Sequence, residues 1–136
     1  MSFSSVTFCL PIADRPTSFA FYGEGLGLEA IGELADDGVP EPLQFSLGHG
    51  ARLMLIPTGG FGWVIGGGDV AERGHRECVI TLGVETEADV DGLVERASAA
   101  GAEIVTPPSQ QPWGYAGVFA DPDGHAVMVT SAFFPR

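Results

Sequence analysis

The sequence contains no lysine, only two cysteines and no long apolar run, and these absences exclude whole classes of protein. Its 136 residues carry six arginines against 18 acidic residues, which gives a formal net charge of −12. A chain this acidic lacks the basic surface that nucleic acids and anionic membranes require, so neither is expected as a partner. No stretch approaches the ~20 consecutive apolar residues that a membrane-spanning helix needs.

Two cysteines are too few for a disulfide framework. Cys9 and Cys78 lie in strand-like runs, and free cysteine often behaves as a small buried hydrophobe, so both are expected to be buried. A nucleophilic role for Cys9 would need an activating base, and the sequence places none beside it. The opening residues lack the basic region of a secretory signal, so a cytoplasmic location is expected.

The first half of the chain predicts a strand, a helix and three more strands. Residues 6–10 form a β-branched and aromatic run that ends at Pro11. Asp14 is a candidate helix N-cap, and Pro16 suits a first helical turn. Further strands are expected at residues 28–34, 43–47 and 52–56.

The second half repeats this order. Thr86, with Asp89 three residues later, is a candidate N-cap for a helix whose apolar stripe ends before Gly101. The tetrapeptide 121–124, Asp-Pro-Asp-Gly, is typical of a type I turn. Strands are expected at residues 78–84, 102–105, 115–120 and 126–130.

The intervening segment 58–75 is rich in glycine and is interpreted as a linker or a mobile flap. It lacks the Gly-Lys-Ser/Thr ending of a phosphate-binding loop. The expected organisation is therefore a first module at residues 1–57, this linker, and a second module at residues 76–136, within one structural domain.

Two motifs on matching repeats carry a family resemblance. Residues 12–14, 18–22 and 25–28 resemble the opening, and residues 113–115 and 119–125 the closing signature, of the glyoxalase, bleomycin-resistance and extradiol-dioxygenase (vicinal oxygen chelate) superfamily. The resemblance covers essentially the whole chain. It implies an α+β fold of two βαβββ modules whose curled mixed sheets form a cleft, and a homodimer is expected.

In the family's enzymes, as the resemblance implies, a divalent metal is held in the cleft by histidine or glutamine on the first strand of a module and glutamate on the last. These donors suit Zn, Ni, Mn or Fe(II). The corresponding residues here are Thr7, Met54, Val79 and Met128. Valine cannot ligate and thioethers prefer Cu(I), so no metal or other cofactor is expected, and binding is favoured over catalysis.

The histidines supply no metal motif. His49 and His125 are expected at hairpin turns, away from the strand centres, and His75 lies in the linker near Glu77. These residues are interpreted as surface or supporting groups, with an adventitious metal at His75 and Glu77 as the alternative.

The residues expected to bind a ligand surround the apolar cleft centre. Strand alternation places Cys9 with Thr7, Thr81 with Val79, and Arg52 with Met54. Arg52 is a candidate anchor for a carboxylate or phosphate, or else the partner of a neighbouring acid. Aromatic side chains in loops are candidate stacking surfaces, with core or interface packing as the alternative. The full expected set is Thr7, Cys9, Arg52, Met54, Trp63, Val79, Thr81, Trp113, Tyr115 and Met128.

Three functions are compatible with this pattern. The leading one is a metal-free binder of a small, largely apolar or aromatic molecule, similar to drug-sequestering resistance proteins, with the acidity favouring a cationic ligand. The second is a metal-dependent lyase or dioxygenase of the same superfamily that uses unrecognised ligands. The third is a module that binds a protein partner.

Overall fold

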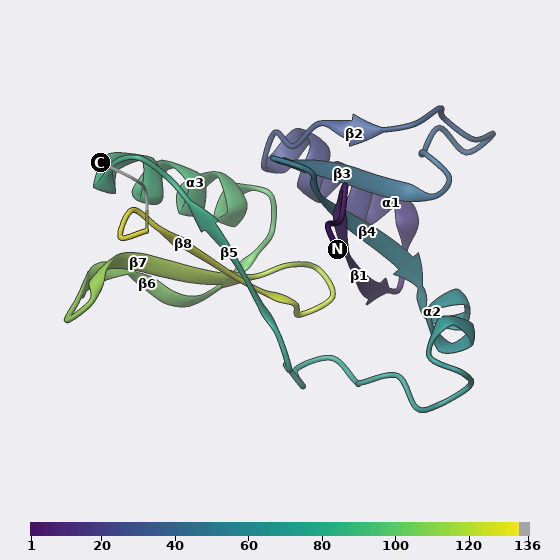
Figure 1. The fold of residues 1–136 in the computed structure, drawn as a ribbon. Coiled ribbons are helices and arrows are strands. Elements are labelled where there is room, and N and C mark those ends of the chain that lie inside the picture. Colours follow the sequence, from purple (N-terminus) through teal and green to yellow (C-terminus); the bar gives the residue numbers. More distant parts are fainter. Residues whose placement is uncertain (134–136) are drawn as a thin grey trace. The chain divides into compact units, whose positions relative to one another are not determined.

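The computed structural model describes residues 1–133 and divides into two compact units, Met1–Ala71 and Glu72–Arg136. Each unit holds one four-stranded mixed sheet, shown in Figure 1. The strand orders are β1-β4-β3-β2 and β5-β8-β7-β6, so the two sheets share one topology. This confirms the expected α+β fold of two βαβββ modules.

The first unit begins with a strand and a short helix that passes into a π-helix. In its sheet, β1 pairs parallel to β4, while β3 pairs antiparallel to both β4 and β2. A second short helix, α2, follows the last strand. The elements are β1 (Val6–Ile12), α1 (Arg15–Phe19), η1 (Ala20–Gly25), β2 (Ala30–Ile31), β3 (Leu43–Gly48), β4 (Ala51–Pro57) and α2 (Thr58–Val64).

The core of this unit lies between the sheet and the α1–η1 helix. Phe45 of β3 is fully buried, and its ring lies 5.8 Å from that of Tyr22 in η1. Leu53 lies opposite Phe45 in the antiparallel pair, and Leu43 lies opposite Leu55. Because side chains alternate along a strand, these residues share the face that the helix covers.

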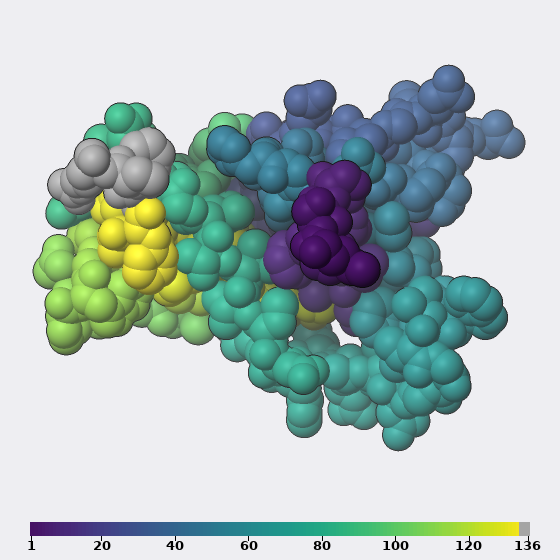
Figure 2. All heavy atoms as spheres, viewed as in Figure 1, coloured from purple at the N-terminus to yellow at the C-terminus, as the bar shows by residue number. Residues whose placement is uncertain are grey.

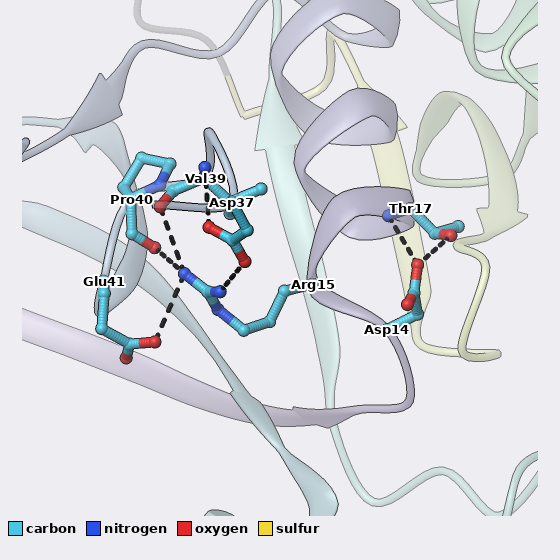
Figure 3. A network of polar contacts seen from close by, with 7 residues as sticks. All are labelled: Asp14, Arg15, Thr17, Asp37, Val39, Pro40 and Glu41. Atoms are coloured by element: carbon cyan, nitrogen blue, oxygen red, sulfur yellow. Dashed lines mark hydrogen bonds and ion pairs between the residues drawn. The ribbon is translucent and has the colours of Figure 1, made fainter. Parts of the chain in front are cut away.

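The start of α1 is fixed by polar contacts (Figure 3). Asp14 is the N-cap, as expected, and its side chain accepts the backbone N–H of Thr17 at 3.0 Å. Next in sequence, Arg15 pairs with Asp37 and Glu41 and donates to the carbonyl of Pro40 at 2.6 Å. Arg15 therefore ties the loop between β2 and β3 to the start of the helix.

In the second unit, α3 covers one face of the sheet (Figure 1). Val90, Val94 and Ala97 of α3 are buried, as is Phe119 of β7. The expected capping box is present, because Thr86 and Asp89 exchange side-chain-to-backbone hydrogen bonds. The elements are β5 (Val79–Gly83), α3 (Glu87–Ala99), β6 (Glu103–Gln111), β7 (Gly114–Ala120) and β8 (Ala126–Thr130).

Two expected strands differ in extent. The strand expected at 28–34 is reduced to Ala30–Ile31, and it ends where Gly32 takes a φ of +97°. The strand expected at 102–105 continues to Gln111. Its pairing with β7 shifts between Thr106 and Ser109, on either side of two prolines that have no N–H to give to the ladder.

The segment expected as a linker or flap begins with the helix α2, and the boundary between the compact units falls after Ala71. Figure 2 shows this teal segment at the surface. Its last residues join the second unit, where Arg73 donates to the carbonyl of Pro122. Arg76, which follows the segment, donates to the carbonyl of Gly124 at 2.9 Å. Whether the segment moves as a flap stays a prediction.

The expectation that the cysteines are buried is wrong. Cys9 and Cys78 are both exposed free thiols. Cys9 lies on an outer strand of its sheet and on the face away from the helix, while Cys78 directly precedes β5. Among residues 1–133, no helix is long and apolar enough to cross a membrane.

Candidate small-molecule site on the open sheet faces

Each sheet has one face that the long helical element of its unit, α1–η1 or α3, does not cover, here named the open face. In the first unit α2 approaches this face at one end, where a Cβ on Gly60 would lie 3.2 Å from Ile56. In the first unit, alternation places Arg52, Met54 and Ile56 of β4 on it, opposite the buried Leu53 and Leu55. Their neighbours on β1 and β3 follow from the strand register. The open face of the first unit thus holds Thr7, Cys9, Pro11, Gln44, Ser46, Arg52, Met54 and Ile56.

These side chains form rows across three strands. In one row, Arg52 of β4 lies between Thr7 of β1 and Ser46 of β3. In the next, Met54 lies between Cys9 and Gln44. Neighbouring strands lie about 4.8 Å apart and rows about 6.7 Å, so a small molecule can span two rows.

The open face of the second unit has the same layout with different chemistry. Ala126 of β8 lies between Val79 of β5 and Ala120 of β7. In the next row Met128 lies between Thr81 and Val118. The first of these rows is entirely apolar, with Val79 exposed and the two alanines buried, and the second has a single hydroxyl. This face therefore suits an apolar or aromatic surface more than a charged group.

The structure groups seven of the ten expected ligand-binding residues on the open faces. One group is Thr7, Cys9, Arg52 and Met54, and the other is Val79, Thr81 and Met128. Sequence reasoning missed Gln44, Ser46 and Val118, which join these groups through strand pairing. The alternation of residues along β3 could have indicated Gln44 and Ser46. The sequence does not show the register that aligns β3 with β4.

The three aromatic candidates are placed differently. Trp63 lies in α2, not in a loop, and is 83 % exposed. Trp113 lies in the β6–β7 turn, where its ring stacks on that of Phe133 with 6.1 Å between centroids. Tyr115 lies in β7, as the strand expected at residues 115–120 places it, and not in a loop.

The side chain of Tyr115 is turned toward α3. Its hydroxyl donates to Oδ1 of Asp91 at 2.6 Å. On the same face of β7, a Cβ on Gly117 would lie 3.2 Å from Val94 of α3. The hydrogen bond to Asp91 raises the pKa of Tyr115, because ionisation would break the bond and place two negative charges together.

The residues present do not fit the divalent metal that the fold family implies. The four positions carry a hydroxyl, two thioethers and an aliphatic side chain, from Thr7, Met54, Met128 and Val79. None is a hard anionic or imidazole donor. Within residues 1–133, no group of three or more His, Cys, Asp or Glu side chains is placed to hold a metal ion.

Two of the histidines lie at strand ends, as expected. His49 is in the β3–β4 turn with a φ of +51°, and His125 is in the β7–β8 turn. The backbone N–H of His125 donates to the buried Asp121, whose carboxylate also accepts from Asp123. The polar groups of this turn thus organise its backbone.

Comparison with known proteins assigns the family. Residues 5–129 match the model of the Glyoxalase/Bleomycin resistance protein/Dioxygenase superfamily. The chain therefore belongs to this superfamily. No curated protein matches it.

Solved structures agree with this assignment. A hypothetical protein from S. aureus is 26 % identical, with a TM-score of 0.79 over 96 % of this chain and 94 % of that one. A glyoxalase-related enzyme from Fulvimarina pelagi is 27 % identical, with a TM-score of 0.79 over 96 % and 88 %. TnmS3, described as an antibiotic binding protein from Streptomyces sp. CB03234, is 25 % identical, with a TM-score of 0.64 over 96 % and 97 %.

Proposed function

We propose that this protein binds a small, largely apolar or aromatic molecule on the open sheet faces of its modules, without a metal ion. The observation that carries the proposal is the identity of the residues at the four metal-ligand positions, Thr7, Met54, Val79 and Met128. They replace metal donors with an apolar surface, and methionine packs adaptably against aromatic rings.

The similarity to an antibiotic binding protein supports a sequestering role. A protein that only sequesters needs a pocket and no catalytic group. The open-face rows offer hydroxyl, thioether, amide and aliphatic groups, which are suited to shape and hydrogen-bond recognition. We therefore propose a binding protein related to drug-resistance proteins. We also propose that it acts as a homodimer, which light scattering would detect.

The first test is metal content. Purified, untagged protein is incubated with Zn, Ni, Mn and Fe(II), desalted and analysed for metals. The expected result is far less than one equivalent of any metal. Near-stoichiometric retention that is abolished by substituting one open-face residue would contradict the proposal and support a metal-dependent lyase or dioxygenase.

The second test locates ligand binding. Thermal-shift screening of aromatic and cationic small molecules should yield compounds that stabilise the wild-type protein, because ligands that bind only the folded state raise its stability. Met128→Glu should abolish the shift by charging the apolar face. Gln110→Glu adds the same charge at an exposed position of β6 and should retain it. Equal loss in both variants would place the binding elsewhere.

A further inference from the structure

Arg52 differs from the other arginines of residues 1–133. Arg15 is ion-paired, Arg73 and Arg76 donate to backbone carbonyls of the β7–β8 turn, and Arg96 lies on the surface of α3 with a contact of its own. Within the described residues, the exposed side chain of Arg52 makes no hydrogen bond or ion pair. Among residues 1–133 of a chain with three times as many acids as bases, the Arg52 guanidinium thus lies unpaired on an open sheet face, near the β3–β4 turn.

Two hydroxyl groups flank Arg52 in its row. Thr7 lies opposite it on β1 and Ser46 on β3, so the three donors lie on three adjacent strands. The Ser46 Oγ accepts the backbone N–H of Gly48 at 3.2 Å, which leaves its own O–H free to donate. A guanidinium between two hydroxyls is a donor set for an oxyanion, because Arg offers a planar fork that matches carboxylate and phosphate.

One acid belongs to the same row. The carbonyl of Glu29 accepts the backbone N–H of Ser46 at 2.9 Å, which places Glu29 beyond Ser46, two strands away from Arg52. No ion pair joins the two side chains within the described residues. Glu29 is therefore the internal competitor that any test of Arg52 has to include.

The open face changes from polar to apolar along β4. After the Arg52 row comes Met54 between Cys9 and Gln44, and then Ile56 opposite Pro11. The second unit repeats the layout without the charge, since the row equivalent to that of Arg52 is Val79, Ala126 and Ala120. In this row the first unit therefore offers a cation and two hydroxyls where the second unit offers three aliphatic side chains.

We propose that Arg52, with Thr7 and Ser46, binds the oxyanion of an apolar or aromatic small molecule whose body lies along β4 over Met54. This inference rests on the proposed function and specifies its ligand class. It departs from the cationic ligand that the net charge favours. Long-range fields are screened within about 10 Å in salt, whereas direct hydrogen bonds to a guanidinium act at contact.

The probes are three compounds that share one aromatic body: naphthoate, naphthyl phosphate and the neutral naphthamide. Isothermal titration calorimetry measures each against the wild-type protein. At least one oxyanion is expected to bind about fivefold or more tightly than naphthamide, since charge-assisted hydrogen bonds exceed neutral ones. The better oxyanion identifies carboxylate or phosphate as the preferred group.

Arg52→Gln should remove the preference for the oxyanion, because it should weaken oxyanion binding far more than naphthamide binding. Arg96→Gln is the matched control, because it removes the same charge from an exposed site on α3. Glu29→Gln should strengthen oxyanion binding slightly by removing the competitor. Circular dichroism and thermal unfolding verify that each variant is folded, as expected for substitutions of exposed side chains.

The outcomes distinguish failure of the oxyanion site from failure of the proposed binding function. If all three probes bind equally, or Arg52→Gln leaves the oxyanion preference intact, the oxyanion site is overturned and the apolar binder stands. A double-mutant cycle that finds strong coupling between Arg52 and Glu29 in stability, with no change in oxyanion affinity, also overturns it. If no probe shows saturable binding, both the inference and the proposed function fail.

Discussion

Met54 and Met128 occupy equivalent positions in two sheets that share one strand order. Met54 lies opposite Cys9 of its parallel neighbour β1, and Met128 lies opposite Thr81 of its parallel neighbour β5. Both methionines are half-buried on an open face. The two halves therefore depart in the same way from the pattern that places a carboxylate at the end of each metal-binding module.

Alternation along β4 predicts that truncating two neighbouring side chains lowers the unfolding free energy by different amounts. Leu53→Ala should cost about 2–5 kcal/mol of unfolding free energy, because Leu53 is 1 % exposed in the core. Met54→Ala should cost about 1 kcal/mol or less, because Met54 lies on the open face. Urea unfolding measures both. Similar losses would show that Met54 also belongs to a packed core.

The contacts of Arg15 predict a second pair of stabilities. Arg15→Gln should cost about 1–3 kcal/mol, because its largely buried guanidinium donates to the carbonyls of Val39 and Pro40. Glu41→Gln should change stability by less than about 0.5 kcal/mol, because the side chain of Glu41 is 64 % exposed and the ion pair is screened.

Chemical denaturation of the two variants under identical salt tests this difference. The loss of unfolding free energy in Arg15→Gln should persist at high salt, because hydrogen bonds to carbonyls are less sensitive to screening than an exposed ion pair. A large cost for Glu41→Gln would show that the ion pair, and not the carbonyl contacts, holds the loop.

Local sequence signals predicted much of this fold. The caps at Asp14 and Thr86 are confirmed, because each depends on residues within three positions. Strand ranges such as 126–130 are confirmed, since strong β-branched runs bounded by turns mark them. Contacts made across long sequence separations were not predicted, and the pairing of Arg15 with Asp37 is an example.

In the candidate site, too, local patterns were predicted from the sequence and long-range contacts were not. Alternation placed Thr7 with Cys9 and Val79 with Thr81, and the strands confirm these pairs. The position of Tyr115 was missed because its partner, Asp91, lies on α3, and only the packing of the helix on the sheet brings them together. Residue-type patterns identify a face, whereas tertiary packing decides which side chains stay on it.

Two glycines predict opposite responses to alanine. Gly92→Ala should stabilise the protein by about 0.5–1 kcal/mol, because a Cβ in α3 would meet nothing within 4 Å and alanine favours a helix. Gly114→Ala should destabilise it by about 1–3 kcal/mol or more, because φ is +150° and the new Cβ would lie 2.3 Å from that of Ala132.

Thermal unfolding of the two variants tests the close approach of the C-terminal segment to the β6–β7 turn. The difference in stability between the two variants is the informative quantity, because both substitutions add one methyl group. If Gly114→Ala were as well tolerated as Gly92→Ala, residue 132 would not pack against the turn as described.

The contact between Tyr115 and Asp91 predicts a titration at alkaline pH. The hydrogen bond to Asp91 raises the pKa of Tyr115 above its ordinary value of 10.0, and the charges of Asp91 and Glu87 add to the effect. The stability from this contact is therefore fully present below the unfolded pKa and is lost as the pH rises through the folded one. Tyrosinate absorbance should show Tyr115 ionising at a higher pH than an unperturbed tyrosine.

Substitutions assign this late titration. Tyr115→Phe should remove this titration and leave only that of Tyr22, the other tyrosine in the chain. Asp91→Asn should move the pKa of Tyr115 back toward its ordinary value, because a neutral amide does not oppose the phenolate charge. Glu95→Gln removes the same charge from an exposed site on α3 and should leave the titration in place. An equal shift in both variants would show that the total charge of the helix, and not the hydrogen bond to Asp91, controls Tyr115.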